Sequence, residues 1–507
     1  MELLIIPIVV VAYLVMEAKE AKKKRVAAAY HFDPAQTHGG ARFAANKDLR
    51  KAGCFRRKGI FFGFSPDGWH ALFYGGFGHI LTVAGARAGK FVTLLVNALL
   101  SWRSSCLVID PKAECAAVTG HGRLRFGKVL VLNPFKMLPD ALKGLTRARF
   151  NPMDILDVAS DSFHALCDKI AAAIVWDEGS EAMHFTSAAR ILVSGVIAAL
   201  KRHGRDSEKN LVAVARVISG DIFGFCRLTV QSTTDPFIIQ KLGRFAAAKA
   251  EESREVMDVV ATAITQLGFI GNAAIAESLC DSNFRFSDLL RSTVTVFICL
   301  PLNMLDICDK YFRLILEIAL TDLLGEARRG KRRPVLAVID EMAQLGPHMK
   351  SLENAMGMAA GAAGLQLWCV LQDLSQLKGM FPNTWETFIQ NTGVSTWFGC
   401  RDQTTREYVS KLAGQCEKVS QSRSVNLDPV SGEPHVTDSQ ATFGRPLLLP
   451  EEVGQLASDE MIAFVEGVTC GPVRARRKFY FKIFGRSRYR NNPYVTRKGS
   501  FLSWLFD

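Results

Sequence analysis

The sequence predicts an α/β protein whose mostly parallel sheet is interrupted by an all-α insertion and preceded by a short N-terminal membrane anchor. Strand-like runs rich in Phe, Ile and Val alternate with helical patterns in residues 59–134, and alanine-rich helical patterns dominate residues 161–282. Strand-like runs return at residue 293. Because strands that alternate with helices are typical of parallel sheets covered by helices, we expect one discontinuous α/β domain with a helical module inserted into it.

Composition and charge limit the class of protein. The chain has 507 residues, of which 49% are hydrophobic, and this suits a large buried core divided into roughly two to four domains. A disordered protein is excluded by this apolar content. The formal net charge of +13 favours a polyanionic partner, either nucleic acid or the anionic face of a membrane. A basic surface without a specific partner is the alternative.

The N-terminus carries an apolar run from Leu3 to Met16, followed by a basic cluster from Lys22 to Arg25. A secretory signal would place its positive charges before the apolar run. The run is shorter than the ~20 residues that cross a bilayer perpendicularly. By the positive-inside rule, we predict that residues 1–25 are a membrane anchor and that the bulk of the chain is cytoplasmic. A buried N-terminal helix and a re-entrant segment are the alternatives.

The twelve cysteines are scattered, contain no C-x-x-C pair, and several lie inside apolar runs, such as Cys299 in VFICL and Cys369 in LWCVL. This pattern is typical of buried free thiols. We therefore expect a reducing compartment, with neither disulfides nor a zinc site.

The first α/β part is predicted to span residues 26–160. Short runs between Gly59 and Ala84 are expected to form strands that lead to a glycine-rich turn. The stretch FVTLLVNALLSW after this turn has apolar residues at helical spacing, and CLVID and KVLVLNPF have the length and composition of buried strands.

The all-α insertion is predicted to span residues 161–285, and the second α/β part residues 286–507. Strand patterns in the second part are TVTVFICLP, VLAVIDE, LQLWCVLQ and VSTWFGCRD. Residues 417–444 are polar and rich in Ser, Asp and Pro, and are predicted to be an exposed excursion. The tail from Arg474 to Phe506 contains no acidic residue, and aromatic residues alternate with its basic ones.

The stretch AGARAGKF has the layout of a phosphate-binding loop between a strand and a helix. Such a loop points successive backbone N–H groups at an anion, and the helix N-terminus adds its dipole. The predicted nucleotide-binding residues are Gly85, Ala86, Arg87, Ala88, Gly89, Lys90 and Phe91. The usual pattern is G-x-x-x-x-G-K-[S/T], so Ala84 and Phe91 depart from it. A chance glycine turn is the alternative.

A second half of a nucleotide site follows later in the sequence. The apolar strand VLAVI ends in Asp340 and Glu341, of which Asp340 suits a magnesium site and Glu341 suits polarisation of the attacking water. The strand LWCVL leads to Gln372 at the same carboxyl edge, where this glutamine could sense the γ-phosphate. Asp110 also ends a strand and competes with Asp340 as the metal carboxylate, but Asp340 is preferred because a glutamate follows it.

With these residues in place, the sequence resembles the type IV secretion coupling proteins, which are TraG-like conjugation ATPases of the RecA-like DNA-pump superfamily. The matching segments are THGGARFA, AGARAGK, VIDPKAE, FNPMDIL, VIDEMAQLG, LQDLSQLK, CRDQTTREYVSK and GRPLLLPEEV. They occur in order between about residues 37 and 480, which is more than chance would produce.

The resemblance implies a RecA-like nucleotide-binding fold, ATP and Mg²⁺ as ligands, and a hexamer anchored in the bacterial inner membrane at the cytoplasmic entrance of a secretion channel. Its partners would be single-stranded DNA or a relaxase–DNA complex, protein effectors, other components of the secretion system and the anionic membrane. Lys90 and Gly89 would hold the phosphates, Asp340 the metal and Glu341 the water, and Gln372 would sense the γ-phosphate.

Several positions depart from the family pattern. After the loop lysine, Phe91 stands where relatives tend to carry a glycine, Ala88 replaces the usual serine, and Ala113 replaces the glycine of D-P-K-G-E. Thr93 lies two residues further along the helix, so it is not expected to replace the missing hydroxyl. Two hypotheses follow: an ATP-driven coupling motor, or a substrate receptor or scaffold that is catalytically weak or inactive.

Overall fold

The computed structural model describes residues 39–176, 183–248, 254–301, 304–326, 333–346, 349–357, 364–427 and 434–495. The predicted anchor at residues 1–25 lies outside the described residues.

A twelve-stranded sheet forms the centre of the molecule, with the strand order β2-β1-β14-β13-β10-β3-β9-β8-β4-β7-β5-β6. The strands that pair in parallel are β3 (His79–Ala84), β4 (Ser105–Ile109), β5 (Lys128–Leu132), β6 (Thr146–Arg147), β7 (Val294–Ile298), β8 (Val335–Ile339), β9 (Leu365–Leu371) and β10 (Thr392–Phe398). The antiparallel strands β1 (Ile60–Phe64), β2 (Ala71–Tyr74), β13 (Glu460–Val465) and β14 (Val473–Arg476) extend it beyond β10. The prediction of a mostly parallel sheet is confirmed.

Alternate residues of the parallel strands supply the cores on the two faces of the sheet. In β3, Leu81 and Val83 belong to one apolar cluster, whereas Ile80 and Ala84 belong to another. The same alternation holds along β8. Because successive side chains of a strand point to opposite faces, a strand that is buried on both sides is mostly apolar, as these strands are.

Helices cover both faces of the sheet. Those of the α/β part are α2 (Asn46–Lys51), the π-helix η2 (Phe91–Leu95), α3 (Val96–Ser101), α4 (Glu114–Arg123), α5 (Pro139–Leu142), η3 (Pro152–Ile155), α13 (Asp288–Arg291), α14 (Leu305–Glu326), η8 (Met342–Leu345), α15 (Lys350–Gly357), α17 (Leu374–Met380), α18 (Trp385–Gln390), α19 (Gln403–Ala413), α20 (Pro450–Gly454), η9 (Tyr480–Lys482) and η10 (Arg486–Arg488).

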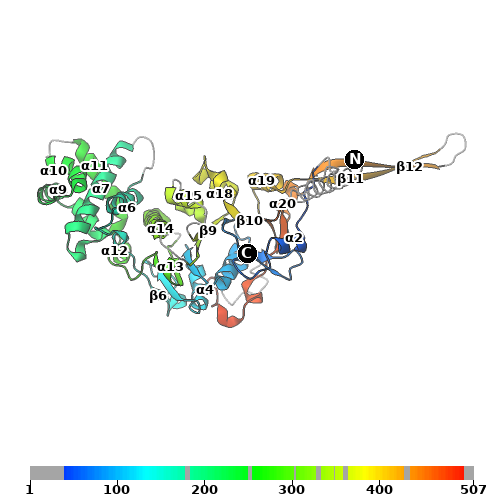
Figure 1. The fold of residues 1–507 in the computed structure, drawn as a ribbon, viewed down its shortest axis with the longest axis horizontal. Coiled ribbons are helices and arrows are strands. Elements are labelled where there is room, and N and C mark those ends of the chain that lie inside the picture. The colour runs from blue at the N-terminus through cyan, green and yellow to red at the C-terminus, as the bar shows by residue number, and fades with distance from the viewer. Residues whose placement is uncertain are drawn as a thin grey trace, which may run out of the picture.

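A helical block lies between β6 and β7 in the sequence and at one end of the molecule in Figure 1. Its elements are α6 (Phe163–Ile174), α7 (Met183–His203), η5 (Asp206–Glu208), α8 (Leu211–Ser219), α9 (Ile222–Ser232), α10 (Pro236–Ala247), α11 (Arg254–Leu267), η6 (Gly268–Gly271) and α12 (Ala273–Leu279). Helix α7 packs against α6, α8, α10 and α11. It is long and apolar enough to cross a membrane, but 67% of its apolar window is buried, so it has the environment of a core helix.

In its described part, residues 417–427 and 434–444, the predicted exposed excursion belongs to a long antiparallel hairpin. Strands β11 (Gln415–Leu427) and β12 (Pro434–Pro446) form this hairpin, which projects at the opposite end of the molecule from the helical block (Figure 1). Polar residues can form strands here because the backbone groups that face the partner strand pair across the hairpin, which does not require burial of side chains. Val419 and Phe443 are accordingly exposed.

Eleven cysteines lie among the described side chains, and each is free. All of them except Cys280 are buried, including Cys299 and Cys369. They pack as small apolar side chains, as their sequence context predicts.

A fully buried arginine joins the first helices to the sheet. Arg123, the last residue of α4, donates hydrogen bonds to the carbonyl oxygens of Leu99, Trp102 and Ser104, at 2.6, 2.8 and 2.7 Å. Its Nε donates to Thr295 Oγ1 of β7 at 2.7 Å. These carbonyls lie at the C-terminal end of α3 and just after it, where a helix leaves acceptors without internal partners.

The substitution Arg123→Met should therefore lower the stability of the sheet domain by about 3 kcal/mol, because it leaves several buried carbonyl groups without donors. Thermal unfolding followed by circular dichroism would show a melting temperature several degrees lower. Arg125→Met is the matched control, since Arg125 is exposed and donates one hydrogen bond, to Leu100 O. Equal melting temperatures for the two variants would contradict this account.

Candidate nucleotide-binding site

The predicted phosphate loop connects β3 to η2 at the carboxyl edge of the sheet. Arg87 and Gly89 adopt left-handed backbone conformations, with φ of 59° and 85°. At Gly85 an added Cβ would lie 2.3 Å from the carbonyl oxygen of Gly399, so only glycine allows β10 to approach this closely. The loop closes with hydrogen bonds from Ala88 N to Gly85 O and from Thr93 N to Gly89 O.

Phe91, in the place of the usual hydroxyl residue, is the first residue of a π-helical turn that is closed by Val96 N donating to Phe91 O. Its partly buried ring packs against an apolar cluster that includes Val92, Tyr480 and Tyr489. The ring is thus part of the contact between the phosphate-loop helix and the C-terminal segment. A π-helical turn at this position is a feature often found at functional sites.

The hydroxyl of Thr93 turns back toward the loop, where Oγ1 donates to Gly89 O at 2.7 Å. The same oxygen accepts a hydrogen bond from Arg477 at 3.2 Å. Both contacts hold the end of the loop against the helix that follows it.

Lys90, Glu341 and Gln372 meet at this edge because β3, β9 and β8 are neighbours in the sheet. Lys90 Nζ lies 3.2 Å from Glu341 Oε1, and Gln372 Nε2 donates to Glu341 Oε2 at 2.9 Å. Both charged side chains are 12% exposed. Among the described residues, the Lys90 ammonium has no hydrogen bond of good geometry, although its nitrogen is buried. A buried ammonium with unused donors is suited to bind an anion.

Asp340 and Glu341 have different electrostatic environments. Burial raises the pKa of Asp340 to about 6, despite the nearby charge of Lys90. Burial would also raise the pKa of Glu341, but the hydrogen bond from Gln372 and the charge of Lys90 leave that pKa below its usual value. Glu341 also has a left-handed backbone, with φ of 51°, a conformation that costs about 1 kcal/mol or more and that often occurs at functional sites.

Asp110, the competing carboxylate, holds the N-terminus of α4. Its Oδ2 accepts a hydrogen bond from Ala116 N at 2.8 Å, and burial raises its pKa to about 7. The residue just before α4 is Ala113, which has a left-handed φ of 55°. The glycine that the resemblance implies at this position would adopt this geometry without strain.

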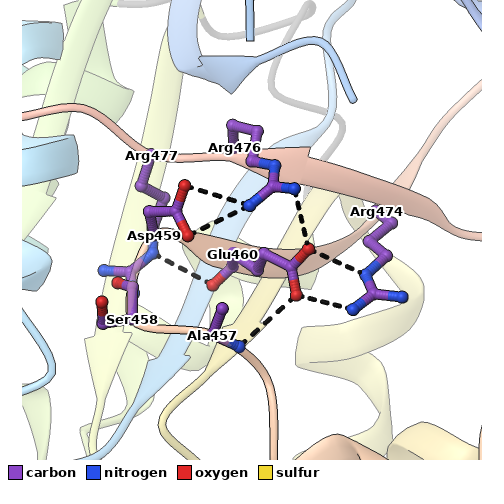
Figure 2. A network of polar contacts seen from close by, with 7 residues as sticks. All are labelled: Ala457, Ser458, Asp459, Glu460, Arg474, Arg476 and Arg477. Carbon is purple, nitrogen blue, oxygen red and sulfur yellow. Dashed lines mark hydrogen bonds and ion pairs between the residues drawn. The ribbon is translucent and has the colours of Figure 1, made fainter. Parts of the chain in front are cut away.

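Sequence reasoning missed Arg477, which follows β14 and reaches the phosphate loop. Its Nη1 donates to Ala88 O at 2.8 Å. In Figure 2, Arg474 and Arg476 reach Glu460 and Asp459, whereas the guanidinium of Arg477 extends toward Ser458. The pattern that could have indicated this residue is a strand-like alternation within a basic run, in which every second residue, Val473, Ala475 and Arg477, is buried. It could be interpreted only once β14 was known to be a strand.

The described part of the C-terminal segment after Arg477, residues 478–495, crosses α4 and reaches the loop that follows β4. Tyr494 Oη donates to Lys112 O at 2.8 Å, and Asn492 hydrogen-bonds Glu114. At Gly122 an added Cβ would lie 1.9 Å from Arg488 O, which shows how closely this segment packs on α4. The aromatic residues that alternate with the basic ones therefore serve packing, with Tyr480 and Tyr489 both buried.

The chain resembles known proteins over most of its length. Residues 21–499 match the family described as type IV secretory system conjugative DNA transfer. VirD4 of Rhizobium rhizogenes is 26% identical over 467 residues, and the match covers 88% of this chain and 65% of that protein. TraG of Escherichia coli is 24% identical over 499 residues, with 88% and 77% covered. The chain thus spans about two thirds or less of the length of the VirD4 relatives that it matches.

Among solved structures, the plasmid coupling protein TrwB in complex with ADP and Mg²⁺ superposes with a TM-score of 0.63 at 17% identity. The superposition covers 88% of this chain and 96% of that one. This likeness confirms the predicted RecA-like α/β fold. Since the family match extends over nearly the whole sequence, the chain belongs to the type IV secretory system conjugative DNA transfer family.

Proposed function

We propose that this protein is an ATP-driven coupling protein that recruits relaxase-bound DNA or protein substrates and delivers them to a type IV secretion channel. The proposal rests mainly on the contacts that Lys90 and Gln372 both make with Glu341, beside a glycine-containing loop. A scaffold that never used nucleotide would have no need for a partly buried ammonium and amide that both contact one carboxylate. The family and its relatives VirD4 and TraG support the secretion role.

ATP would bind with its phosphates at the loop from Gly85 to Phe91. The backbone N–H groups of the loop and the N-terminus of η2 would face the phosphate oxygens. The Lys90 ammonium, which forms an ion pair with Glu341, would move to the outer phosphates. A phosphate anion would then replace the carboxylate as its partner.

Magnesium fits the site through Asp340. This carboxyl group is partly buried at the end of β8, next to the loop, and a cation would offset the hydration that the carboxylate loses there. When bound, Mg²⁺ would neutralise charge on the phosphates. Phe91 offers no hydroxyl ligand, so the Asp340 carboxylate would hold the ion from the protein side, together with water.

Glu341 and Gln372 would act on the attacking water. Departure of Lys90 toward the phosphates would free one oxygen of Glu341 to accept the proton of that water. The amide of Gln372 already donates to the other oxygen, which fixes the orientation of the carboxylate. Binding of ATP would thus prepare the base for hydrolysis.

We also propose that the protein lies in the inner membrane, with most of the chain cytoplasmic, and that it forms a hexamer. It would contact other components of the secretion system and the anionic membrane. The net charge of +13 supports a polyanionic partner. We further propose that residues 26–160 and 286–507 act as the nucleotide-binding motor domain and that residues 161–285 form the all-α domain that recognises substrate.

The substitution Glu341→Gln should lower the ATP turnover number by roughly 10²- to 10⁴-fold, the usual effect of removing a general base, while ATP still binds. Lys90→Ala should weaken ATP binding itself. Turnover and ATP affinity would be measured on the full chain in detergent, with and without single-stranded DNA. Glu407→Gln, on the exposed face of α19, is the control. Wild-type turnover no higher than that of Glu341→Gln would support the inactive scaffold instead.

The missing hydroxyl can be tested by restoring it. Because Ser at this position normally binds Mg²⁺, Phe91→Ser should lower the Mg²⁺ concentration for half-maximal ATP turnover by about three- to tenfold relative to Phe91→Ala. Phe91→Ala removes the same aromatic packing without adding a ligand, so it separates the two effects. Identical Mg²⁺ requirements would show that position 91 lies away from the metal.

DNA binding should depend strongly on salt. Phosphate contacts made by Lys and Arg release counterions, so affinity for single-stranded DNA should fall at least about tenfold between roughly 50 and 200 mM salt. Fluorescence anisotropy with a labelled oligonucleotide measures this directly. Absent or salt-independent binding would indicate that the cargo is protein alone.

A further inference from the structure

The C-terminal strand presents three arginines in different environments. Arg474 and Arg476 are partly exposed and form ion pairs with Glu460 and Asp459 (Figure 2). Arg477, the next residue, is only 5% exposed. Because successive side chains alternate along a strand, Arg477 follows the buried direction of Val473 and Ala475.

The donors of Arg477 are directed at neutral acceptors. Nη1 donates to Ala88 O at 2.8 Å and to Thr93 Oγ1 at 3.2 Å. Nη2 donates to Ser458 O at 2.5 Å, and Nε donates to Glu460 O at 3.3 Å. The guanidinium carbon lies 3.8 Å from the centre of the Phe398 ring, which adds a cation–π contact.

Within the described part of the chain, no carboxylate forms an ion pair with Arg477. The nearest acidic influence is Asp459, and both oxygens of that carboxylate accept hydrogen bonds from Arg476. Burial lowers the pKa of Arg477 to about 10, so the guanidinium remains charged at neutral pH. A buried charge without a counterion is unfavourable, and an anion bound nearby would offset that cost.

The contact with Ala88 also orients the phosphate loop. The peptide bond between Ala88 and Gly89 is trans and planar, so its N–H points opposite to its C=O. Since the carbonyl of Ala88 points to Arg477, the N–H of Gly89 points away from it and is left for another acceptor. The hydrogen bond from Arg477 to Thr93 secures the other side of the same turn.

We propose that Arg477 is a positioning residue that holds the Ala88–Gly89 peptide in its anion-binding orientation and supplies a buried positive charge behind the phosphates. The C-terminal strand thereby sets the affinity for nucleoside di- and triphosphates. This inference rests on the proposed binding of ATP at the loop.

The test measures the affinities of the full chain for ATP and AMP by isothermal titration calorimetry. Arg477→Met should weaken ATP binding by about tenfold or more, which corresponds to the loss of one hydrogen bond to a charged group. AMP binding should change much less, because AMP lacks the phosphates that the loop end would contact. Arg477→Lys keeps the charge but loses the planar fork of donors, so its ATP affinity should lie between those of the unmodified protein and Arg477→Met.

Arg476→Met is the matched control, because it removes a neighbouring arginine of the same strand that does not contact the loop. Equal ATP affinities for Arg477→Met and Arg476→Met, or an equal loss for ATP and AMP, would overturn the proposal. If Arg477→Met does not fold, Arg477→Lys decides: a several-fold loss confined to ATP supports the proposal, and an unchanged ratio of ATP to AMP affinity overturns it. Absence of ATP binding by the unmodified protein would overturn the proposed function as well, and it would be seen before any substitution.

Discussion

The parallel strands at the centre of the sheet are buried on both faces, so a charged side chain on them can reach water or a ligand only where a strand ends. Strands β10, β3, β9, β8, β4 and β7 contain no Asp, Glu, Lys or Arg. The charged residues of the site occur instead directly after them, as Asp110, Asp340 and Glu341. Because the strands are parallel, their carboxyl ends meet at one edge, and the separate segments of the sequence form one site.

This arrangement explains which parts could be predicted from the sequence. Apolar runs that end in Asp340, Glu341 or Gln372 predict buried strands with a polar residue at the carboxyl end. Because the strands are parallel, these carboxyl ends lie at the same edge of the sheet. The packing of Phe91 and the role of Arg477 could not be predicted in this way. Both depend on β14 and the segment after it, whose pairing joins residues nearly 400 positions apart. A local pattern carries no information about such pairing.

The site is also a place where local preferences are overridden. Arg87, Ala113 and Glu341 all adopt left-handed conformations that side chains disfavour, and each lies in a segment that follows a strand of the parallel sheet. Surrounding hydrogen bonds, such as those of Asp110 to α4 and of Gln372 to Glu341, hold these conformations. Strain of this kind is retained where a precise backbone path matters more than local stability. The strained residues lie at the same edge of the sheet as the candidate site residues.

The contact between Arg477 and Ala88 has a consequence for the order of folding. The two residues are separated by 389 positions, so the phosphate loop cannot receive its support until almost the entire chain has been synthesised. Strands β3 to β10 can form earlier, because their partners precede β14 in the sequence. A nascent or C-terminally shortened chain would then hold a sheet with an unsupported loop. Addition of β14 and Arg477, rather than formation of the parallel strands, is the event that finishes the nucleotide site.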